Sequence, residues 1–403
     1  MTLDVAKIRK DFPIYNREIR DGQRLIYLDS GATSQKPRSV LDAERNFYEN
    51  HNAAAHRGAH QLAEEATTAY EEARDTVARF IGAKTDEIVF TKSATESLNL
   101  LAYTISLKAG DEVVVTEMEH HANLIPWQQA CARTGAILKW ISVTEDGRLD
   151  LSALDHLITS KTKIIALTHQ SNVLGTINDL NEIVKIGKKF GAKIILDACQ
   201  SVPHFKIDVS KLGVDFLVFS AHKALGLLGT GVLWGAELNS LPPFLFGGSM
   251  IKSVTMTEAT WADAPTRFEG GVPNVAGAIA LAEAFKYLDS IGIEKIHEHE
   301  IKLVGALLEG LKNIEGIKVF GPDNLIDRGG TVSFTVEGIH PHDLGQFLDS
   351  KGIALRTGHH CAWPLAKKFN LTASTRASFY LYNDLDDVVA LLDGIKAAKE
   401  FFK

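Results

Sequence analysis

Cysteine is scarce in this chain of 403 residues, which contains only Cys131, Cys199 and Cys361. An odd number of cysteines without a C-x-x-C pair disfavours both a disulfide framework and a thiolate zinc site. The same pattern is typical of a protein that stays in a reducing compartment. We therefore expect a cytoplasmic protein with no metal centre.

Positive charge and long apolar runs are also in short supply. The 43 Lys and Arg residues are outnumbered by 50 Asp and Glu residues, and the formal charge of −7 argues against a general nucleic-acid binder. The most apolar stretch, 215–235, is interrupted by His222, Lys223 and several glycines, so neither half is long enough to cross a bilayer. Residues 1–12 are charged and lack the apolar core of a signal peptide. We expect neither a membrane nor a nucleic acid as partner.

What the sequence does have is a regular alternation of short β-rich runs with helical patterns. Short apolar runs are typical of strands buried in a parallel sheet, and their alternation with helices predicts an α/β fold. After about residue 275, a long helical stretch followed by further strands predicts a smaller α+β domain. The predicted strands are 87–91, 111–116, 163–169, 193–198, 215–220, 331–338, 352–358 and 377–383, and the predicted helices include 152–160, 180–191 and 277–314.

Polar side chains gather where the predicted strands end. In an open α/β sheet, ligands bind beyond the carboxyl ends of the strands, so polar residues at several such ends describe one site. Each residue alone has an ordinary explanation, such as helix capping or a solvated turn, but their coincidence at one edge favours a binding site. The residues are His120, Asn172, Asp197, Gln200, Ser220, His222 and Lys223.

A possible phosphate cradle follows the strand predicted at 87–91. Ser93 or Thr95 opens a helix, with Glu96 placed as in a capping box. The free N–H groups and the dipole at a helix N-terminus favour an anion. Helix capping alone would explain this motif, but the segment 220–223, Ser-Ala-His-Lys, offers further donors. We therefore expect a bound phosphate.

Together these residues suit pyridoxal 5′-phosphate (PLP). Lys223 would form a Schiff base with the cofactor, and Asp197 would pair with the pyridine nitrogen and keep it protonated. A protonated ring withdraws electrons from a bound substrate. The strand-end residues therefore predict a PLP enzyme.

Segments spread along almost the whole chain carry a family resemblance. They are YLDSGATSQKP, AAAHRGAHQLA, EMEHHANLIPWQ, SNVLGT, DACQSVPH, DFLVFSAHK, RFEGGVPN, RTGHHCAWPL and TRASFYLYN. The chain resembles the class V aminotransferases of PLP fold type I, and more narrowly the SUF-type (group II) cysteine desulfurases. The resemblance implies a large domain, 21–275, with a mainly parallel seven-stranded sheet between helices. It also implies a smaller α+β C-terminal domain, 276–403, against which an N-terminal segment, 1–20, packs.

The resemblance also implies the roles of the site residues. His120 would stack on the cofactor ring, Gln200 would reach its phenolic oxygen, and the Arg376 guanidinium would hold the substrate carboxylate. The implied cofactor-binding residues are Lys223, Asp197, Gln200, His120, Thr95, Ser220, His222 and Asn172; the implied substrate-binding residues are Arg376, Arg356, Asn172, His56 and Arg57; the implied catalytic residues are Cys361, Lys223 and His120.

Cys361 lies in the segment RTGHHCAWPL, 356–365, whose Gly, His and Pro residues mark a turn. By composition alone it is either an ordinary half-buried thiol or a working nucleophile. The resemblance implies the second: the Cys361 thiolate would take sulfur from cysteine and carry it as a persulfide. Arg356, His359 and His360 lie close in sequence and would favour the thiolate, which is the reactive form. We expect Cys131 and Cys199 to be packing residues.

Several positions depart from the family pattern. Ala94 and Val272 stand where the family usually has hydroxyl residues that contact phosphate, and Ala221 stands where it has glycine. Leu227 and Leu228 replace a Pro-Thr pair. Two lost hydroxyl contacts at about 1 kcal/mol each would weaken cofactor binding by a factor of tens unless water or backbone compensates.

The implied partners are L-cysteine, a second copy of the chain and a sulfur-acceptor protein of iron–sulfur cluster assembly. The short Cys361 loop predicts slow turnover without that acceptor. His342 lies in a segment, GIHPHD, that resembles the contact with a zinc-binding acceptor, although helix capping explains it equally well. Three alternatives stay open: a selenocysteine lyase, another lyase or transaminase of this fold, and a non-catalytic scaffold.

Overall fold

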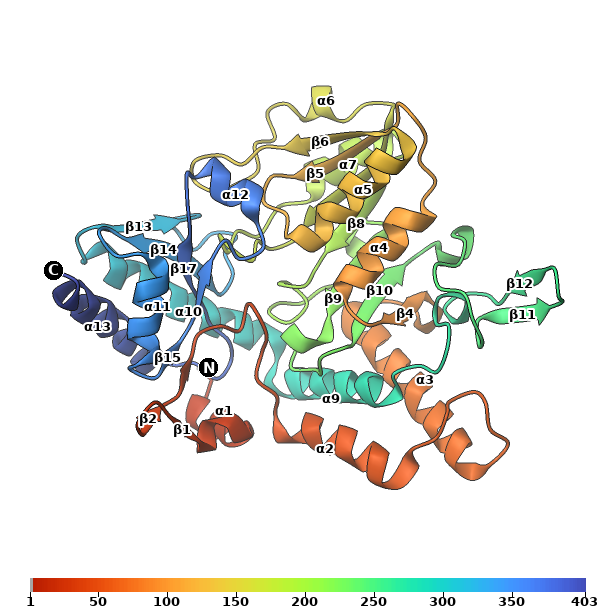
Figure 1. Ribbon diagram of the computed structural model, residues 1–403, viewed down its shortest axis with the longest axis horizontal. Helices are drawn as coiled ribbons and strands as arrows, with labels where there is room; N and C mark the ends of the chain where they lie inside the picture. Colours follow the sequence, from red (N-terminus) through yellow and green to blue (C-terminus); the bar gives the residue numbers. More distant parts are fainter. Residues whose placement is uncertain (1–2) are drawn as a thin grey trace.

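The computed structural model describes residues 3–403 (Figure 1). Its larger sheet has seven strands in the order β4-β10-β9-β8-β7-β5-β6. β10 runs in the direction opposite to the other six strands, so the expected mainly parallel seven-stranded sheet is confirmed. The strands are β4 (Ile88–Thr91), β5 (Glu112–Thr116), β6 (Ile137–Ile141), β7 (Thr162–Thr168), β8 (Lys193–Asp197), β9 (Phe216–Ser220) and β10 (Gly231–Gly235).

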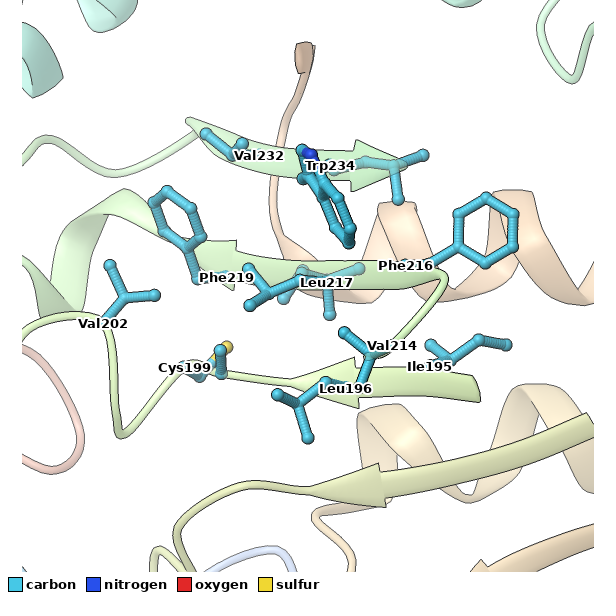
Figure 2. Close-up of a cluster of buried hydrophobic side chains, with 14 of the residues drawn as sticks. Ile195, Leu196, Cys199, Val202, Val214, Phe216, Leu217, Phe219, Val232 and Trp234 are labelled. Atoms are coloured by element: carbon cyan, nitrogen blue, oxygen red, sulfur yellow. The ribbon is translucent and has the colours of Figure 1, made fainter. Parts of the chain in front are cut away.

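The central strands are buried on both faces, as their continuous Val, Ile, Leu and Phe content requires. Every residue of β5, β9 and β10 is buried. Figure 2 shows side chains of β8, β9 and β10 packed together, with Cys199 at the end of this cluster near Leu196 and Val202. Burial raises the pKa of the Cys199 thiol to about 12, which fits a packing residue.

Helices cover this sheet and fix its position. Phe285 of α9 stacks on Phe80 of α3 with ring centroids 3.9 Å apart and contacts Phe219 of β9 at 5.8 Å, so α9 ties α3 to the sheet. The helices in this part of the chain are α2 (Arg38–Asn46), α3 (Gln61–Ile81), α4 (Ala94–Thr104), α5 (Ile125–Thr134), α6 (Leu154–Leu157), α7 (Asn181–Lys189), α8 (Val209–Leu212) and α9 (Val275–Ile291).

The second sheet is antiparallel and has its own hydrophobic core. Its order is β13-β14-β17-β16, and helices from the C-terminal part pack against it (Figure 1). The strands and helices in this part of the chain are β13 (Ile317–Phe320), β14 (Thr331–Val336), β15 (Ile353–Ala354), β16 (Arg356–Gly358), β17 (Ser374–Ser378), α10 (Ile293–Lys312), α11 (Pro341–Asp349), α12 (Trp363–Lys368) and α13 (Leu385–Phe401).

The N-terminal residues contact the C-terminal part of the chain. Arg9 of α1 (Val5–Lys10) forms ion pairs of 2.6 Å with Asp384 and Asp387. Further short strands are β1 (Glu18–Ile19), β2 (Gln23–Arg24), β3 (Ile26–Tyr27), which pairs with β15, and the hairpin β11 (Ile251–Val254) and β12 (Ala259–Trp261). The division into 1–20, 21–275 and 276–403 stays a prediction, and residues 1 and 2 of it lie outside the described residues.

The structure differs from the predicted elements in several places. The strand predicted at 352–358 is divided into β15 and β16, which belong to different sheets. The helix predicted at 277–314 is interrupted at Gly292, whose φ of 95° ends α9 before α10 begins. The strand predicted at 377–383 is shifted, because β17 covers Ser374–Ser378 and Tyr380 and Tyr382 follow in a buried loop. The strands β6, β10 and β13 were not among the predicted runs. Within residues 3–403, no helix has the length and apolar character needed to cross a membrane.

Candidate active site

The carboxyl ends of β8 and β9 open into a cavity of about 250 Å³. It is walled by residues from several strand ends, from α4 and from the antiparallel sheet, which lie far apart in the sequence. Most of the predicted site residues line it, namely Thr95, His120, Asn172, Asp197, Ser220, His222, Lys223, Arg356 and Arg376. The parallel sheet therefore assembles the site that the strand-end pattern predicts.

Asp197 and His120 occupy two walls of the cavity. Asp197 is the last residue of β8, and its Oδ1 accepts a hydrogen bond from the backbone N–H of Cys199 at 3.0 Å. His120 follows β5, and its Nδ1 accepts from the N–H of Ala122 at 3.1 Å. Burial, reinforced by the charge of Lys223, lowers the pKa of His120 to about 3. His120 is therefore a neutral ring at physiological pH, which can stack on an aromatic cofactor.

A set of donors surrounds the N-terminus of α4. Ser220 ends β9, and its Oγ accepts from the N–H of Ala94 at 2.9 Å, which fixes the strand end against the helix. The Oγ of Ser93 caps the helix by accepting from the N–H of Glu96 at 3.3 Å. The Thr95 N–H, for which the described residues provide no hydrogen-bond partner, and the hydroxyls beside it form a cradle suited to an anion.

His222 adds a second observation that points to a ligand. Its side chain lines the cavity, yet its buried Nδ1 has no partner among the described residues. Burial, together with the charges of Lys223 and Lys36, lowers the pKa of His222 to about 4. A buried polar atom without a partner is unfavourable unless a ligand completes it.

Arg376 presents a guanidinium to the cavity from β17. It is 1% exposed and donates to the carbonyl of Asn172 at 3.0 Å and to Oδ1 of Asp29 at 2.9 Å. Its Nε is buried without a partner in the described chain. A fixed guanidinium with spare donors is suited to binding a carboxylate.

Cys361 lies on a strained turn between β16 and α12. His360 and Cys361 both have left-handed backbone, with φ of 52° and 59°. Hydrogen bonds from other loops help to hold the turn: His121 N–H donates to the Cys361 carbonyl at 2.7 Å, and Asn172 Nδ2 donates to the His360 carbonyl at 2.8 Å. Strained backbone of this kind persists where surrounding contacts determine it, and it is concentrated at active sites. The Cys361 side chain remains half-buried.

Arg356 provides a positive charge beside the thiol, but His360 does not contribute one. The Arg356 Nη2 lies 3.5 Å from the Cys361 Sγ. His360 is instead buried with its Nε2 2.9 Å from the Ser374 Oγ. Burial, together with the charges of Arg376 and Arg356, lowers its pKa far below the ordinary value. The expectation that His360 favours the thiolate by its charge is therefore not supported.

Four predicted site residues lie outside the cavity lining. Gln200 is behind it and donates through Nε2 to the carbonyl of Gly31 at 2.8 Å. Cys361 stands beside it, next to Arg356. His56 and Arg57 are exposed near the start of α3, where they contact Glu71 and Ser249. Their predicted role near a subunit interface remains a prediction.

The departures from the family pattern lie in different surroundings. Ala94 lines the cavity and uses its backbone N–H, whereas Val272 and Leu228 lie outside it and are 74% and 73% exposed. Ala221 is fully buried, and a Cβ on Gly226 would come within 2.9 Å of its methyl group. The extra methyl at position 221 therefore fits because residue 226 is glycine.

Glu119 is a supporting residue that the sequence pattern did not single out. It is 1% exposed and accepts hydrogen bonds from Thr116 Oγ1, Asn123 Nδ2 and Thr168 N–H at 2.6, 2.6 and 2.9 Å. These contacts tie the ends of β5 and β7 together directly beside His120. Its one sequence signal is an acidic residue next to a strand-end histidine.

The residues of the cavity fit PLP. Asp197 is available for a ring nitrogen, His120 is neutral, and the unpartnered Nδ1 of His222 lies beside the anion cradle at α4. Lys223 supplies the amine with which an aldehyde cofactor condenses. Lys223, Asp197, His120, Ser220, His222 and Thr95 would hold the cofactor.

Comparisons with known proteins agree with this chemistry. The family model Aminotransferase class-V matches residues 26–391, and this family depends on PLP. The chain is 52% identical over 410 residues to the probable cysteine desulfurase 2 of Mycobacterium leprae, covering 99% of this chain and 98% of that protein. It is 46% identical to the probable cysteine desulfurase of Halalkalibacterium halodurans, covering 99% of each.

Solved structures give the same result. The cysteine desulfurase of Thermococcus onnurineus NA1 superposes with a TM-score of 0.93 at 41% identity, covering 99% of this chain and 98% of that one. The Escherichia coli cysteine desulfurase CsdA superposes with a TM-score of 0.91 at 35% identity, covering 100% of both. The fold, the cavity and the relatives together establish that the chain belongs to the aminotransferase class-V family, among its cysteine desulfurases.

Proposed function

We propose that this protein is a PLP-dependent L-cysteine desulfurase of the SUF type. It converts L-cysteine to L-alanine and carries the sulfur as a persulfide on Cys361 for transfer to an acceptor protein in iron–sulfur cluster assembly. The observation that carries the proposal is the Cys361 thiol beside a cavity that contains both Lys223 and Arg376. A lysine for the cofactor, an arginine for a carboxylate and a thiol for sulfur are the three groups that this reaction needs.

The residues of the cavity divide the work. Arg376 holds the carboxylate of cysteine, with Asn172 fixing the guanidinium through its carbonyl. Bound PLP supplies an electron sink that makes the α-hydrogen of the substrate acidic. Lys223 takes the proton from the α-carbon and returns one to the product. His120, neutral because it is buried, lies on the wall of the cavity, where its ring can stack on the cofactor during the reaction.

Cys361 completes the reaction without an external oxidant. Its thiolate attacks the sulfur of the substrate, so an S–S bond forms as the Cβ–S bond breaks. Both sulfur atoms are oxidised, while Cβ is reduced to the methyl group of alanine. The hydrogen that Cys361 gives up is, in the overall balance, the one that Cβ gains. Arg356, 3.5 Å from Sγ, stabilises the thiolate before the attack.

The acceptor and the second subunit are part of the proposal. His342 is exposed at the start of α11, and its backbone N–H donates to Nδ1 of His340 at 3.2 Å. Because His340 provides the cap, the His342 ring is not needed for it; its Nε2 lies 3.5 Å from the exposed Gln346 Nε2, a contact that a zinc-binding acceptor would replace. Exposed apolar side chains on and near the β11–β12 hairpin, which projects from the body of the molecule in Figure 1, support a homodimer; they include Phe246, Val254, Met256 and Val272.

The test is the release of alanine from L-cysteine without a reductant by PLP-loaded wild type and Cys361→Ala. The proposal predicts a burst of about one alanine per subunit in wild type, because the persulfide is not removed. Cys361→Ala should give almost none. The near-isosteric variant Cys361→Ser serves as a control. It should release as little alanine as Cys361→Ala does.

Other outcomes point to the alternatives. Equal alanine release by wild type and Cys361→Ala would exclude Cys361 as the sulfur acceptor and favour a selenocysteine lyase, because selenium leaves more readily. No alanine from either protein despite bound PLP would favour the scaffold. A parallel assay with L-selenocysteine separates these two results.

A further inference from the structure

Four donors converge on one backbone oxygen next to Lys223. The carbonyl of His222 accepts from the Ser34 N–H at 3.0 Å and the Ser34 Oγ at 3.0 Å. It also accepts from the Thr33 Oγ1 at 3.0 Å and the Lys36 Nζ at 2.9 Å. A carbonyl oxygen has two lone pairs, so two donors would already satisfy it. Four donors are more than this peptide group needs.

Lys36 is an unusual member of this group. It is half-buried, and no carboxylate of the described residues lies within salt-bridge distance of its amine. Its partners are the carbonyls of His222 and Ser34 and the Ser34 hydroxyl. Burial lowers its pKa to about 7. An amine withdrawn from water without a carboxylate is costly, which indicates that the contact with His222 has a use.

The backbone after Lys223 is strained, and the same segment holds it. Leu225 is fully buried with φ of 61°, a conformation that is rare for a bulky side chain and costs about 1–3 kcal/mol. Its N–H donates to the Ser34 Oγ at 2.9 Å. Lys223 therefore lies between two backbone groups, the His222 carbonyl and the Leu225 N–H, that are both bound to the segment Thr33–Lys36.

The segment also reaches the cavity directly. Gly31 and Ala32, immediately before Thr33, line it, and the Gly31 carbonyl is bound by Gln200. Lys36 itself is absent from the lining. Apart from its charge, which acts on His222, Lys36 reaches the site through the backbone that it binds.

We propose that Lys36 is a positioning residue for Lys223. With Thr33 and Ser34 it forms a clamp, the Thr33–Lys36 clamp, that fixes the backbone of residues 222–225 so that the Lys223 side chain projects into the cavity. This inference depends on the proposed function only for the reaction in which Lys223 takes part. The effect of the clamp on the backbone does not depend on the substrate.

The test is amide hydrogen exchange of the full-length protein, with PLP and after its removal, in wild type and Lys36→Met. The amides of Ala224, Leu225 and Gly226 should exchange at least about tenfold faster in the variant, while those of β9 stay unchanged. Lys206→Met is the matched control, because Lys206 also donates to a backbone carbonyl. That carbonyl belongs to Phe80, which is far from Lys223 in the sequence. Unchanged exchange at 224–226, or equal loss in the control, would overturn the clamp.

A second measurement separates positioning from general stabilisation. The rate at which Lys223 condenses with added PLP, followed by visible absorbance, should fall about tenfold in Lys36→Met and recover to within about threefold in Lys36→Arg, which restores a donor. If Lys36→Met does not fold, Thr33→Val removes one donor without changing charge and should speed exchange at 224–226 about threefold. A variant with faster exchange but wild-type condensation would overturn the positioning role. Normal condensation without alanine release in wild type would refute the proposed function and leave the clamp standing.

Discussion

The wall around Lys223 and the turn that carries Cys361 reach the same site by opposite means. Lys223 and Asp197 are placed by consecutive parallel strands, with the sheet core directly behind them. Cys361 comes from the antiparallel sheet and is placed by two consecutive left-handed residues and hydrogen bonds to other loops. One region is fixed by packing and the other by a small number of polar contacts.

This difference matches what each region must do. Lys223 and Asp197 serve a cofactor that stays bound, so a buried and rigid wall is an advantage. Cys361 must meet the substrate sulfur and then an acceptor protein, which a half-buried turn allows. Substitutions in the wall should therefore affect chemistry on the cofactor, whereas those in the turn should affect the thiol.

The largest expected effect separates the two regions most sharply. Lys223→Ala should lower alanine release by at least about 10³-fold, because it removes the amine that moves protons at the substrate. In the same variant, the rate at which iodoacetamide alkylates Cys361 should stay within about twofold of the wild-type rate. Steady-state alanine assays and mass spectrometry of the modified cysteine measure the two effects. A large change in alkylation would show that the turn depends on the wall.

Arg376 tests the link between the regions, because it contacts Asn172, which also holds the His360 carbonyl. Arg376→Lys should raise the KM for cysteine about 10–100-fold, since a charged hydrogen bond contributes about 1.5–3 kcal/mol. A change confined to kcat would contradict the assignment to the substrate carboxylate. Initial rates over a range of cysteine concentrations decide between these outcomes.

Arg356 should produce a smaller effect that is confined to the turn. Replacing it by glutamine, Arg356→Gln, removes the positive charge 3.5 Å from Sγ and should slow iodoacetamide alkylation about three- to tenfold. Lys367→Gln, which removes a positive charge in the last turn of α12, serves as the control and should leave the alkylation rate unchanged. Equal rates in Arg356→Gln and wild type would remove Arg356 from the thiolate's environment.

The smallest expected effect concerns stability and pH. The folded protein keeps His360 neutral because burial lowers its pKa, whereas the unfolded chain binds a proton below about pH 6.5. Wild type therefore loses stability through this group as pH falls from about 6.5. His360→Asn, which tolerates the left-handed backbone, should lack this loss. Its Tm relative to wild type should rise by about 3 °C between pH 7 and pH 4.5 in calorimetry; a parallel shift of both proteins would contradict the prediction.

The parallel sheet was largely predictable, because the runs of β-rich residues at 163–169, 193–198 and 215–220 stay buried and regular. The strands β6 and β10 escaped the pattern for different reasons. β6 lies at the edge and is only partly buried, and β10 begins and ends with glycine, Gly231 and Gly235, a residue that is depleted in strands. Runs of apolar residues predict strands that are buried on both faces. They predict edge strands and glycine-rich strands less well.

The cavity was predictable for a similar reason: residues at the ends of parallel strands must meet at one edge. The Thr33–Lys36 clamp was not, because its contacts with His222 join residues 186 to 189 positions apart in the chain. The neutral state of His360 was hidden as well, since it depends first on burial and then on the charges of Arg376 and Arg356. Sequence position indicated which groups come together, and packing decides their protonation.

The left-handed backbone at Cys361 restricts how this enzyme could change over evolution or by design. A branched side chain such as Val or Thr at φ of 59° would be a severe outlier, whereas Asn, Asp and Gly tolerate that conformation. A library at position 361 should therefore return folded proteins with small polar residues and few with branched ones. The backbone at position 361 could therefore carry aspartate as a carboxylate nucleophile, but it could not carry threonine as a hydroxyl nucleophile.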